Sequence, residues 1–180
     1  MTLADTFACG TPRRRWLPSI VGDTATIPLT RGKFALIDAS DLSLVAPYAW
    51  AFNPGPHTGY AVTHRQGQFL AMHRLLTGAG AGVIVDHTDM DGLNNRRANL
   101  RACTKAENSR RRRSTSGKSP FKGVAFHRAS GLHHATINVD GRQFSLRYHK
   151  TAEDAARAYD AAAIQHFGDF ALTNRELGLL

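Results

Sequence analysis

From residue 25 onward, the apolar positions come in short runs that are typical of strands. Residues 26–29 and 34–37 are two such runs, and the Gly-containing turn at 30–33 between them predicts a hairpin. Because Pro28 has no backbone N–H to donate, we expect its run at a sheet edge. Residues 1–24 show no periodicity and are predicted to be a flexible N-terminal tail.

A second hairpin is predicted from the runs at 60–62 and 68–70, which flank a turn containing Gly67. Upstream of it, alternating aromatic residues predict a strand whose side chains pack in the core: Tyr48, Trp50 and Phe52.

The C-terminal part, residues 121–174, has the pattern of three strands followed by one helix. Asp140-Gly141 is a strong hairpin signal. Thr151, with Asp154 three residues on, predicts the start of a helix whose apolar stripe covers the sheet. Strict alternation along the second and third strands gives the sheet a polar face with His134, Thr136, Asn138, Gln143, Ser145 and Arg147, and an apolar face that includes Phe144, Leu146 and Tyr148.

Ser and Gly between these two parts predict a linker over 114–120. The sequence therefore predicts an α+β protein. A β-rich N-terminal domain covers 25–113, and a small three-stranded antiparallel sheet packed on one helix covers 121–174.

The charge of the chain is +9, and most of its 23 Lys and Arg residues lie between 96 and 150, where Glu107 and Asp140 are the acids. Such a basic segment indicates a polyanion-binding surface. No apolar run approaches the roughly 20 residues that span a bilayer, so we expect no membrane association. The N-terminus lacks an apolar signal segment, and Cys9 and Cys103 form no CxxC pair. These features exclude a cysteine zinc ribbon and a disulfide framework, and they favour the cytoplasm.

The stretch 83–108 is the most informative part of the chain. Its β-branched run at 83–85 predicts a strand, and residues 98–103 predict a return strand after a polar loop. Thr104 and Glu107, three residues apart, form a capping-box signature that starts a helix.

This arrangement is predicted to bring together Asp86 and His87 from the first strand and Asn108 from the helix. Carboxylate and amide oxygens suit Mg²⁺ or Mn²⁺. Neutral imidazole can accept a proton from water. The Asp-rich loop also invites a calcium-site interpretation. Aligning Gly92 with the invariant Gly of such a loop puts His87 and Ala98 at ligand positions, which excludes that interpretation.

At these residues the sequence resembles the phage-type HNH homing endonucleases, which have a ββα-metal core. The Asp-His pair, Asn99 twelve residues after His87, and Asn108 nine residues further on match the spacing of that family. The resemblance implies metal binding by Asp86 and Asn108 and a general base at His87. It implies that Asn99 positions the loop or the imidazole. The last family position is often His and is Asn108 here.

Arginines around this stretch are candidates for contacts with phosphates: Arg96, Arg97, Arg110, Arg111, Arg112 and Arg113. An exposed charged helix end is the alternative for the last four. His73 precedes the stretch in a His-Arg-Leu run that recurs in the resembled family. It is predicted to be either a core residue or a neighbour of the site.

Residues 121–174 resemble the Apetala/ethylene-response-factor DNA-binding domain through FKGV, TAEDAARAYDAAA and FGDFALTN. Ala125 stands where that family usually has Arg, His133 where it has an aromatic residue, and Arg147 where it has Gly, so the preferred DNA sequence does not carry over. A sheet that packs only on the nuclease domain is the alternative. By the resemblance, the candidate DNA contacts are Lys122, His127, Thr136, Asn138, Gln143, Ser145 and Arg147.

The sequence thus predicts a metal-dependent endonuclease that nicks double-stranded DNA at a preferred site, in a bacterial host cell if a phage encodes it. A monomer and a dimer both remain open. One alternative is a DNA-binding transcriptional regulator with an inactive nuclease scaffold. Another is a structural or RNA-binding protein that uses the same charge.

Overall fold

A computed structural model describes residues 17–65, 67–111 and 119–180 of the chain. Within these residues the protein is a mixture of short helices and small antiparallel sheets, as the α+β prediction requires. The chain divides into two units, Met1–Ala102 and Cys103–Leu180, and each is described by itself below.

The first sheet of the N-terminal unit has the order β1-β2-β3, built from β1 (Ser19–Val21), β2 (Thr24–Pro28) and β3 (Phe34–Asp38). The β2–β3 hairpin is confirmed, with the 3₁₀ helix η1 (Thr30–Gly32) in its turn. The predicted edge position of β2 is wrong, because β1 forms from residues that we assigned to the tail. β1 pairs only with residues 24–26 of β2, so the missing N–H of Pro28 lies beyond this pairing.

The second sheet has the order β4-β5-β6, built from β4 (Ala51–Asn53), β5 (Tyr60–Arg65) and β6 (Gln68–Ala71). The β5–β6 hairpin is confirmed. The aromatic strand is shorter than predicted. Trp50 lies before β4, where it is buried and its indole N–H donates to the carbonyl oxygen of Val45 at 3.0 Å. Two short helices complete this core: α1 (Leu42–Val45), preceded by η2 (Ala39–Asp41), and α2 (Met72–Thr77).

The predicted strands of the central stretch form a two-stranded sheet of β7 (Ile84–His87) and β8 (Leu100–Cys103), with η3 (Arg97–Asn99) leading into β8. The loop between them is attached to β3. Leu36 donates its N–H to the oxygen of Leu93 at 2.8 Å and accepts the N–H of Asn95 at 2.7 Å. The backbone of this loop is therefore fixed alongside β3, at the edge of the first sheet.

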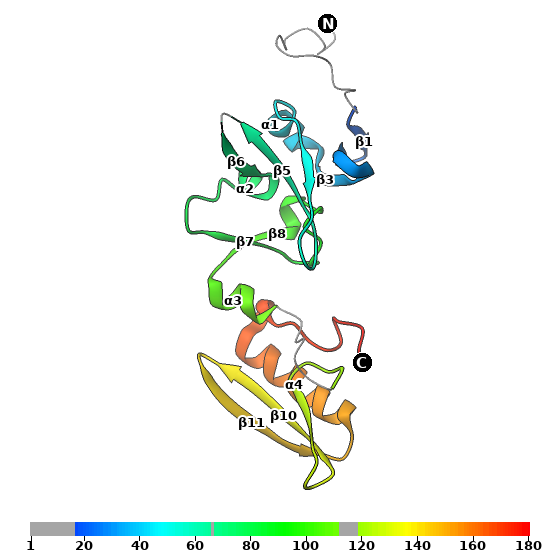
Figure 1. Ribbon diagram of the computed structural model, residues 1–180, viewed down its shortest axis with the longest axis vertical. Coiled ribbons are helices and arrows are strands. Elements are labelled where there is room, and N and C mark those ends of the chain that lie inside the picture. The colour runs from blue at the N-terminus through cyan, green and yellow to red at the C-terminus, as the bar shows by residue number, and fades with distance from the viewer. Residues whose placement is uncertain (1–16, 66, 112–118) are drawn as a thin grey trace, which may run out of the picture. The chain divides into compact units, whose positions relative to one another are not determined.

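The C-terminal unit confirms three strands and one helix: β9 (Val124–His127), β10 (Leu132–Val139), β11 (Arg142–His149) and α4 (Ala152–Phe167), followed by η4 (Gly168–Phe170). The strand order is β11-β10-β9, and α4 covers one face of this sheet (Figure 1). Asp140 and Gly141 both have positive φ, as the predicted hairpin turn needs. Thr151 caps α4 by accepting the N–H of Asp154 at 3.1 Å. The helix buries Ala155, Ala156, Tyr159, Ala162 and Ala163. The predicted apolar stripe contained Ala155, Tyr159 and Ala162 of these, but neither Ala156 nor Ala163.

The FKGV and FALTN segments of the C-terminal unit are in direct contact. The buried side chain of Asn174 accepts the N–H of Lys122 at 2.7 Å and donates to its carbonyl oxygen at 3.2 Å. Gly123, at φ +76°, passes under the ring of Tyr159, where any Cβ would lie 2.0 Å from the ring. The FKGV and FALTN segments are therefore held together by packing that tolerates few other residues.

A bulge in β11 overturns one prediction about the sheet faces. Thr136 pairs with Ser145, but His134, two residues earlier, pairs with Tyr148, three residues later. The extra residue puts Tyr148 on the polar face, where its ring stacks on His134 with centroids 4.4 Å apart. Arg147 adopts φ +75° at the bulge, a conformation that suits Gly, the residue usual at this position in the resembled family.

Candidate active site

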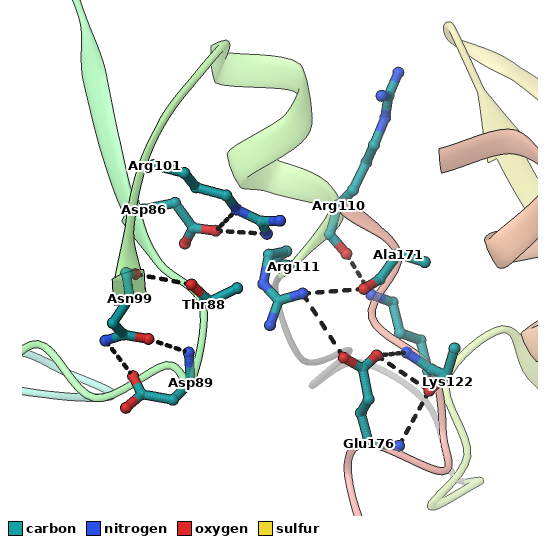
Figure 2. A network of polar contacts seen from close by, with 11 residues as sticks. Asp86, Thr88, Asp89, Asn99, Arg101, Arg110, Arg111, Lys122, Ala171 and Glu176 are labelled. Atoms are coloured by element: carbon teal, nitrogen blue, oxygen red, sulfur yellow. Dashed lines mark hydrogen bonds and ion pairs between the residues drawn. The ribbon is translucent and has the colours of Figure 1, made fainter. Parts of the chain in front are cut away.

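β7 ends with the two residues on which the candidate site depends, Asp86 and His87. The Asp86 side chain is 11% exposed, and its Oδ2 atom accepts two hydrogen bonds from Arg101 on β8. The donors are Nε at 3.1 Å and Nη2 at 2.9 Å, and Figure 2 shows the guanidinium facing the carboxylate. Our sequence analysis missed Arg101. The sequence did contain a signal for this pair, because Asp86 and Arg101 carry opposite charges on two strands that were predicted to lie side by side.

His87 is buried, with 5% of its surface exposed. Its Nε2 atom lies 3.3 Å from Oδ1 of Asn95, another residue that the sequence analysis missed. Because the amide nitrogen of Asn95 donates to the oxygen of Leu93, Oδ1 is the acceptor and Nε2 carries the proton. Burial lowers the pKa of His87, against the opposing effects of Asn95 and the nearby acids Asp89, Asp86 and Asp91. The imidazole is therefore neutral near pH 7.

His73, on α2, lies directly beside this imidazole. The two histidine rings meet edge to face with centroids 5.2 Å apart, and Tyr60 contacts both rings at 5.6 and 5.9 Å. The Nδ1 atom of His73 is buried and has no hydrogen-bond partner among the described residues. Burial, followed by the charges of His87 and Arg74, lowers the pKa of His73 to about 4. Of the two predictions for His73, the geometry favours a neighbour of the site.

Asn99 organises the loop that follows β7. Its Oδ1 atom accepts the N–H of Asp89 at 3.0 Å, and its Nδ2 atom donates to Oδ1 of Asp89 at 2.8 Å and to the oxygen of Asn94 at 2.7 Å. Thr88 donates its hydroxyl to the oxygen of Asn99 at 2.8 Å (Figure 2). One buried amide thus ties Asp89, near the start of the loop, to Asn94, near its end. The role that the family resemblance implies for Asn99 in the reaction stays a prediction.

The carboxylates of Asp89 and Asp91 accept hydrogen bonds from within this loop and from Asn99. Burial opposes ionisation of Asp89, but hydrogen bonds from Asp91, Asn94 and Asn99 outweigh it and lower the pKa of Asp89. Gly92 packs so closely on the preceding loop that a Cβ there would lie 2.4 Å from the oxygen of Gly59. The loop is a rigid turn whose carboxylates stabilise its own backbone.

Asn108, the third predicted member of the site, lies on α3 (Lys105–Arg110) and is half-buried. The predicted capping box is present: Thr104 accepts the N–H of Glu107 at 3.2 Å, and Glu107 accepts the N–H of Thr104 at 2.7 Å. α3 groups with the C-terminal unit, whereas Asp86 and His87 belong to the N-terminal one. That Asn108 meets Asp86 stays a prediction.

The donor chemistry fits a hard divalent cation. Asp86 and Asn108 offer oxygen ligands, and Mg²⁺ commonly takes one or two protein oxygens and completes its shell with water and phosphate. Among the residues that the structure describes, no group of three His, Cys, Asp or Glu side chains could form a complete protein cage. Such a site depends on an added phosphate and water.

The predicted phosphate-binding arginines differ in their environments. Arg96 is exposed and donates to Asn94 at 3.3 Å. Arg97 makes a bidentate pair with the buried Asp41, with contacts of 2.8 to 3.1 Å, and hydrogen bonding to this acid raises the pKa of Arg97. Arg112 and Arg113 lie outside the described residues.

Two residues in α3 and just after it are attached to the rest of the C-terminal unit. Arg110 pairs with Asp140 at 3.1 Å and lies over the ring of Phe167 at 4.6 Å. Arg111 has 5% of its side chain exposed, and it donates to the oxygen of Ala171 at 3.0 Å and approaches Glu176 at 4.0 Å (Figure 2). These contacts attach both residues to the C-terminal unit, and Arg111 is almost fully buried by them. A phosphate contact of Arg110 stays a prediction.

Lys122 is held in the same way. Its ammonium donates to the carbonyl oxygen of Arg110, and burial, followed by the charge of Arg111, lowers the pKa of Lys122 to about 8. Lys122 and Arg110, which lie on opposite sides of the predicted linker in the sequence, are therefore in direct contact. Residues 114–118 of this linker lie outside the described part of the chain.

The remaining candidates for DNA contact lie on the sheet of the C-terminal unit. Thr136, Asn138, Gln143 and Ser145 share one face by register, and Ala125 and His127 on β9 belong to the same face. The Nε2 atom of His134 forms a hydrogen bond with the hydroxyl of Ser145 at 2.8 Å, and the side-chain amide of Gln143 donates to the hydroxyl of Thr136 at 3.4 Å. Tyr148, 46% exposed, adds an aromatic ring between His127 and His134. The sequence analysis missed it because the bulge has no signal in an alternating pattern.

Two comparisons with known proteins bear on this geometry. Residues 79–110 match the family of HNH endonucleases. The matched segment runs from the residues before β7 to the end of α3, and so contains Asp86, His87, Asn99 and Asn108.

The chain is also similar to a protein of Acanthamoeba polyphaga mimivirus that is named an uncharacterized HNH endonuclease. The two are 27% identical over 151 residues, which cover 81% of this chain and 76% of the relative. Both likenesses support a nuclease, a hydrolase that acts on DNA. In the described ranges, none of the helices has the length and apolar character to cross a membrane.

Proposed function

We propose that this protein is a metal-dependent DNA endonuclease that hydrolyses one phosphodiester bond and leaves a nick. The observation that carries the proposal is the pair at the end of β7: a carboxylate that carries a cationic partner, followed by a buried, neutral imidazole. A nuclease needs a proton acceptor beside a site for positive charge, and these two residues offer both.

In the proposed reaction His87 is the general base. Its Nε2–H is engaged by Asn95, so Nδ1 is the nitrogen that accepts a proton from the attacking water. The water oxygen forms a bond to phosphorus, and the bond from phosphorus to the 3′ oxygen breaks. The leaving oxygen takes a proton from solvent, which gives 5′-phosphate and 3′-hydroxyl ends. Tyr60 and His73 hold the imidazole ring in place through edge contacts.

Asp86 and Asn108 are the residues proposed to hold Mg²⁺ or Mn²⁺. When bound, the cation would stabilise charge on the scissile phosphate and on the leaving oxygen. Asn99 keeps the loop after β7 in one conformation, so that Asp86 and His87 keep their orientation between turnovers.

The C-terminal unit is proposed to bind double-stranded DNA through the polar face of its sheet. Hydroxyl, amide and imidazole groups on this face can donate to and accept from base edges in a major groove. Arg96 and the arginines at 112 and 113 are proposed to contact phosphates, which adds affinity without sequence information. We leave Arg111 out of this set because it is buried.

A plasmid assay tests the proposal. Supercoiled DNA incubated with the full chain should convert to the open-circular form with Mg²⁺ or Mn²⁺ and remain supercoiled with EDTA. Asp86→Ala should abolish the metal-supported reaction. Cleavage that is equally fast in EDTA would refute metal dependence, and unchanged cleavage by Asp86→Ala would refute the ligand assignment.

One observation favours a second candidate, a DNA-binding regulator with an inactive nuclease scaffold. The Asp86 carboxylate is paired with Arg101, and a permanent ion pair would keep a metal away. This candidate predicts sequence-selective DNA binding without cleavage in any divalent metal.

A further inference from the structure

Arg101 lies on the strand that faces Asp86, and it has no role in the reaction described above. Its Nε and Nη2 atoms donate to the same carboxylate oxygen, Oδ2, at 3.1 and 2.9 Å. Two charge-assisted donors on one oxygen form a well-oriented pair, because the planar guanidinium cannot turn without losing both bonds.

The pair is secluded from water. The Arg101 side chain is 19% exposed and that of Asp86 is 11% exposed. The pair Arg157–Asp154 on α4 gives the contrast: it has a similar contact of 3.0 Å, but its side chains are 65% and 54% exposed. Solvent weakens the exposed pair, whereas the attraction within the secluded pair is screened less by water.

A divalent cation would need the same carboxylate. A hard cation lies at about 2.0–2.1 Å from its oxygen ligands, which puts two positive charges within a few ångströms of the guanidinium if Arg101 stays in place. The guanidinium occupies the lone pairs of Oδ2, and its charge repels a cation placed on either carboxylate oxygen, so the two bound states of Asp86 compete.

We propose that Arg101 is a built-in competitor of the metal: it neutralises Asp86 in the metal-free protein, and a divalent cation must displace it to bind. The inference rests on the proposed metal site at Asp86. Its consequence is that Arg101 weakens metal binding and raises the metal concentration at which the site is loaded.

Mn²⁺ binding to the full chain without DNA measures this directly, because electron paramagnetic resonance reports the unbound ion. Arg101→Gln should bind Mn²⁺ about tenfold more tightly than the wild type, since a pair of charge-assisted bonds no longer competes. Arg101→Lys keeps the positive charge but lacks the paired N–H donors of the guanidinium. Its affinity for Mn²⁺ should lie between those of the wild type and Arg101→Gln. The matched control Arg157→Gln removes one charge from the exposed pair and should leave the affinity unchanged.

Asp86→Asn tests the metal site separately from the competition by Arg101. If it binds Mn²⁺ as well as the wild type does, the metal site itself is wrong, and the Arg101 inference fails with it. If Asp86→Asn loses binding while Arg101→Gln matches the wild type, the competition is refuted and the metal site stands. A tightening as large in Arg157→Gln as in Arg101→Gln would show a general charge effect and also refute competition.

A second measurement uses the wild type alone, in case the Arg101 variants fold poorly. The Nε–H signal of Arg101 in a nitrogen-detected spectrum should shift at the same Mg²⁺ concentration as the Asp86 carboxyl carbon. A carboxyl shift without a change at Arg101 would overturn the proposal. No shift at either residue would overturn it together with the metal site.

Discussion

The candidate catalytic residues and the candidate DNA-reading residues are both polar, but the first are largely buried and the second lie on an open surface. Asp86, His87 and Asn99 are largely buried, and each is held by hydrogen bonds with other side chains or backbone groups of the same unit. Thr136, Asn138, Gln143 and Ser145 lie on one side of an open sheet. Their side chains bond one another, as Gln143 does to Thr136, or other groups of the same hairpin: His134, Gly141 and Arg147.

This difference matches two physical requirements. A proton acceptor near pH 7 needs an environment that keeps it neutral and in one orientation, which burial supplies. A surface that reads base edges needs donors and acceptors that a DNA groove can reach, which burial would prevent. Changes in the buried group should therefore affect chemistry and stability, and changes in the exposed group should affect binding.

The strongest test of this contrast is His87→Ala. Loss of the proposed general base should slow nicking by about 10²–10⁴-fold, while the affinity for DNA stays nearly unchanged. Single-turnover cleavage and a gel-shift assay on the same DNA measure the two effects. His64→Ala, which removes an exposed histidine from β5, is the control and should retain activity. Nicking by His87→Ala at the wild-type rate would refute the assigned base.

The pH dependence of stability tests the burial of His73. Its pKa falls from an ordinary 6.5 to about 4 on folding, so the unfolded chain binds a proton in a range where the folded protein does not. The contribution of the neutral, buried His73 to the free energy of unfolding is fully present above pH 6.5. It is lost as the pH falls toward 4, and the loss amounts to about 3 kcal/mol.

Urea unfolding at several pH values between 7 and 4 measures this loss. His73→Phe should make the curve shallower in this window, with the part that the buried His87 contributes remaining, whereas His64→Phe should not change its slope. Equal slopes for the wild type and His73→Phe would contradict the burial argument.

Asn99→Ala should cost roughly 2 kcal/mol of unfolding free energy, because it leaves the N–H of Asp89 and the oxygen of Asn94 without their partner. Thermal or urea unfolding measures the loss. Asn53→Ala, at an exposed position on β4, is the matched control and should stay within about 0.5 kcal/mol of the wild type. A cost no larger than that of the control would show that the loop does not depend on Asn99.

The smallest expected effect is that of Tyr148→Ala on DNA binding. If the polar face of the sheet contacts DNA, loss of this ring should weaken binding by about 1 kcal/mol, or roughly fivefold. Phe126→Ala, an exposed aromatic that the register puts on the other face, should bind as the wild type does. Equal losses in both variants would argue against recognition by this face.

Much of the local structure follows from the sequence. The β2–β3 and β5–β6 hairpins, the Thr104–Glu107 capping box and the start of α4 at Thr151 were all predicted. The interactions that define these features join residues a few positions apart, so their signals lie within short windows. The Asp86-His87 pair was found for the same reason: both residues end one β-branched strand.

The pairings between distant residues were not predictable in this way. Arg101 reaches Asp86 across 15 positions, His73 meets His87 across 14, and Arg111 is buried against a residue 60 positions away. A charged or aromatic residue has the same local signature whether it faces solvent, DNA or another side chain, so its partner is decided only when the strands and helices pack.

The C-terminal sheet shows the same limit at a finer scale. Alternation placed Thr136 and Ser145 on the polar face, as the register has them, but one bulged residue moved Tyr148 to that face as well. The sequence by itself determined the β2–β3 and β5–β6 hairpins, the type and order of the C-terminal elements and the choice of residues proposed for metal-assisted hydrolysis, because these depend on local propensity and side-chain chemistry. Only the tertiary structure decided that His87 is buried and neutral and that Asp86 carries Arg101, because burial and charge pairing are properties of the packed chain.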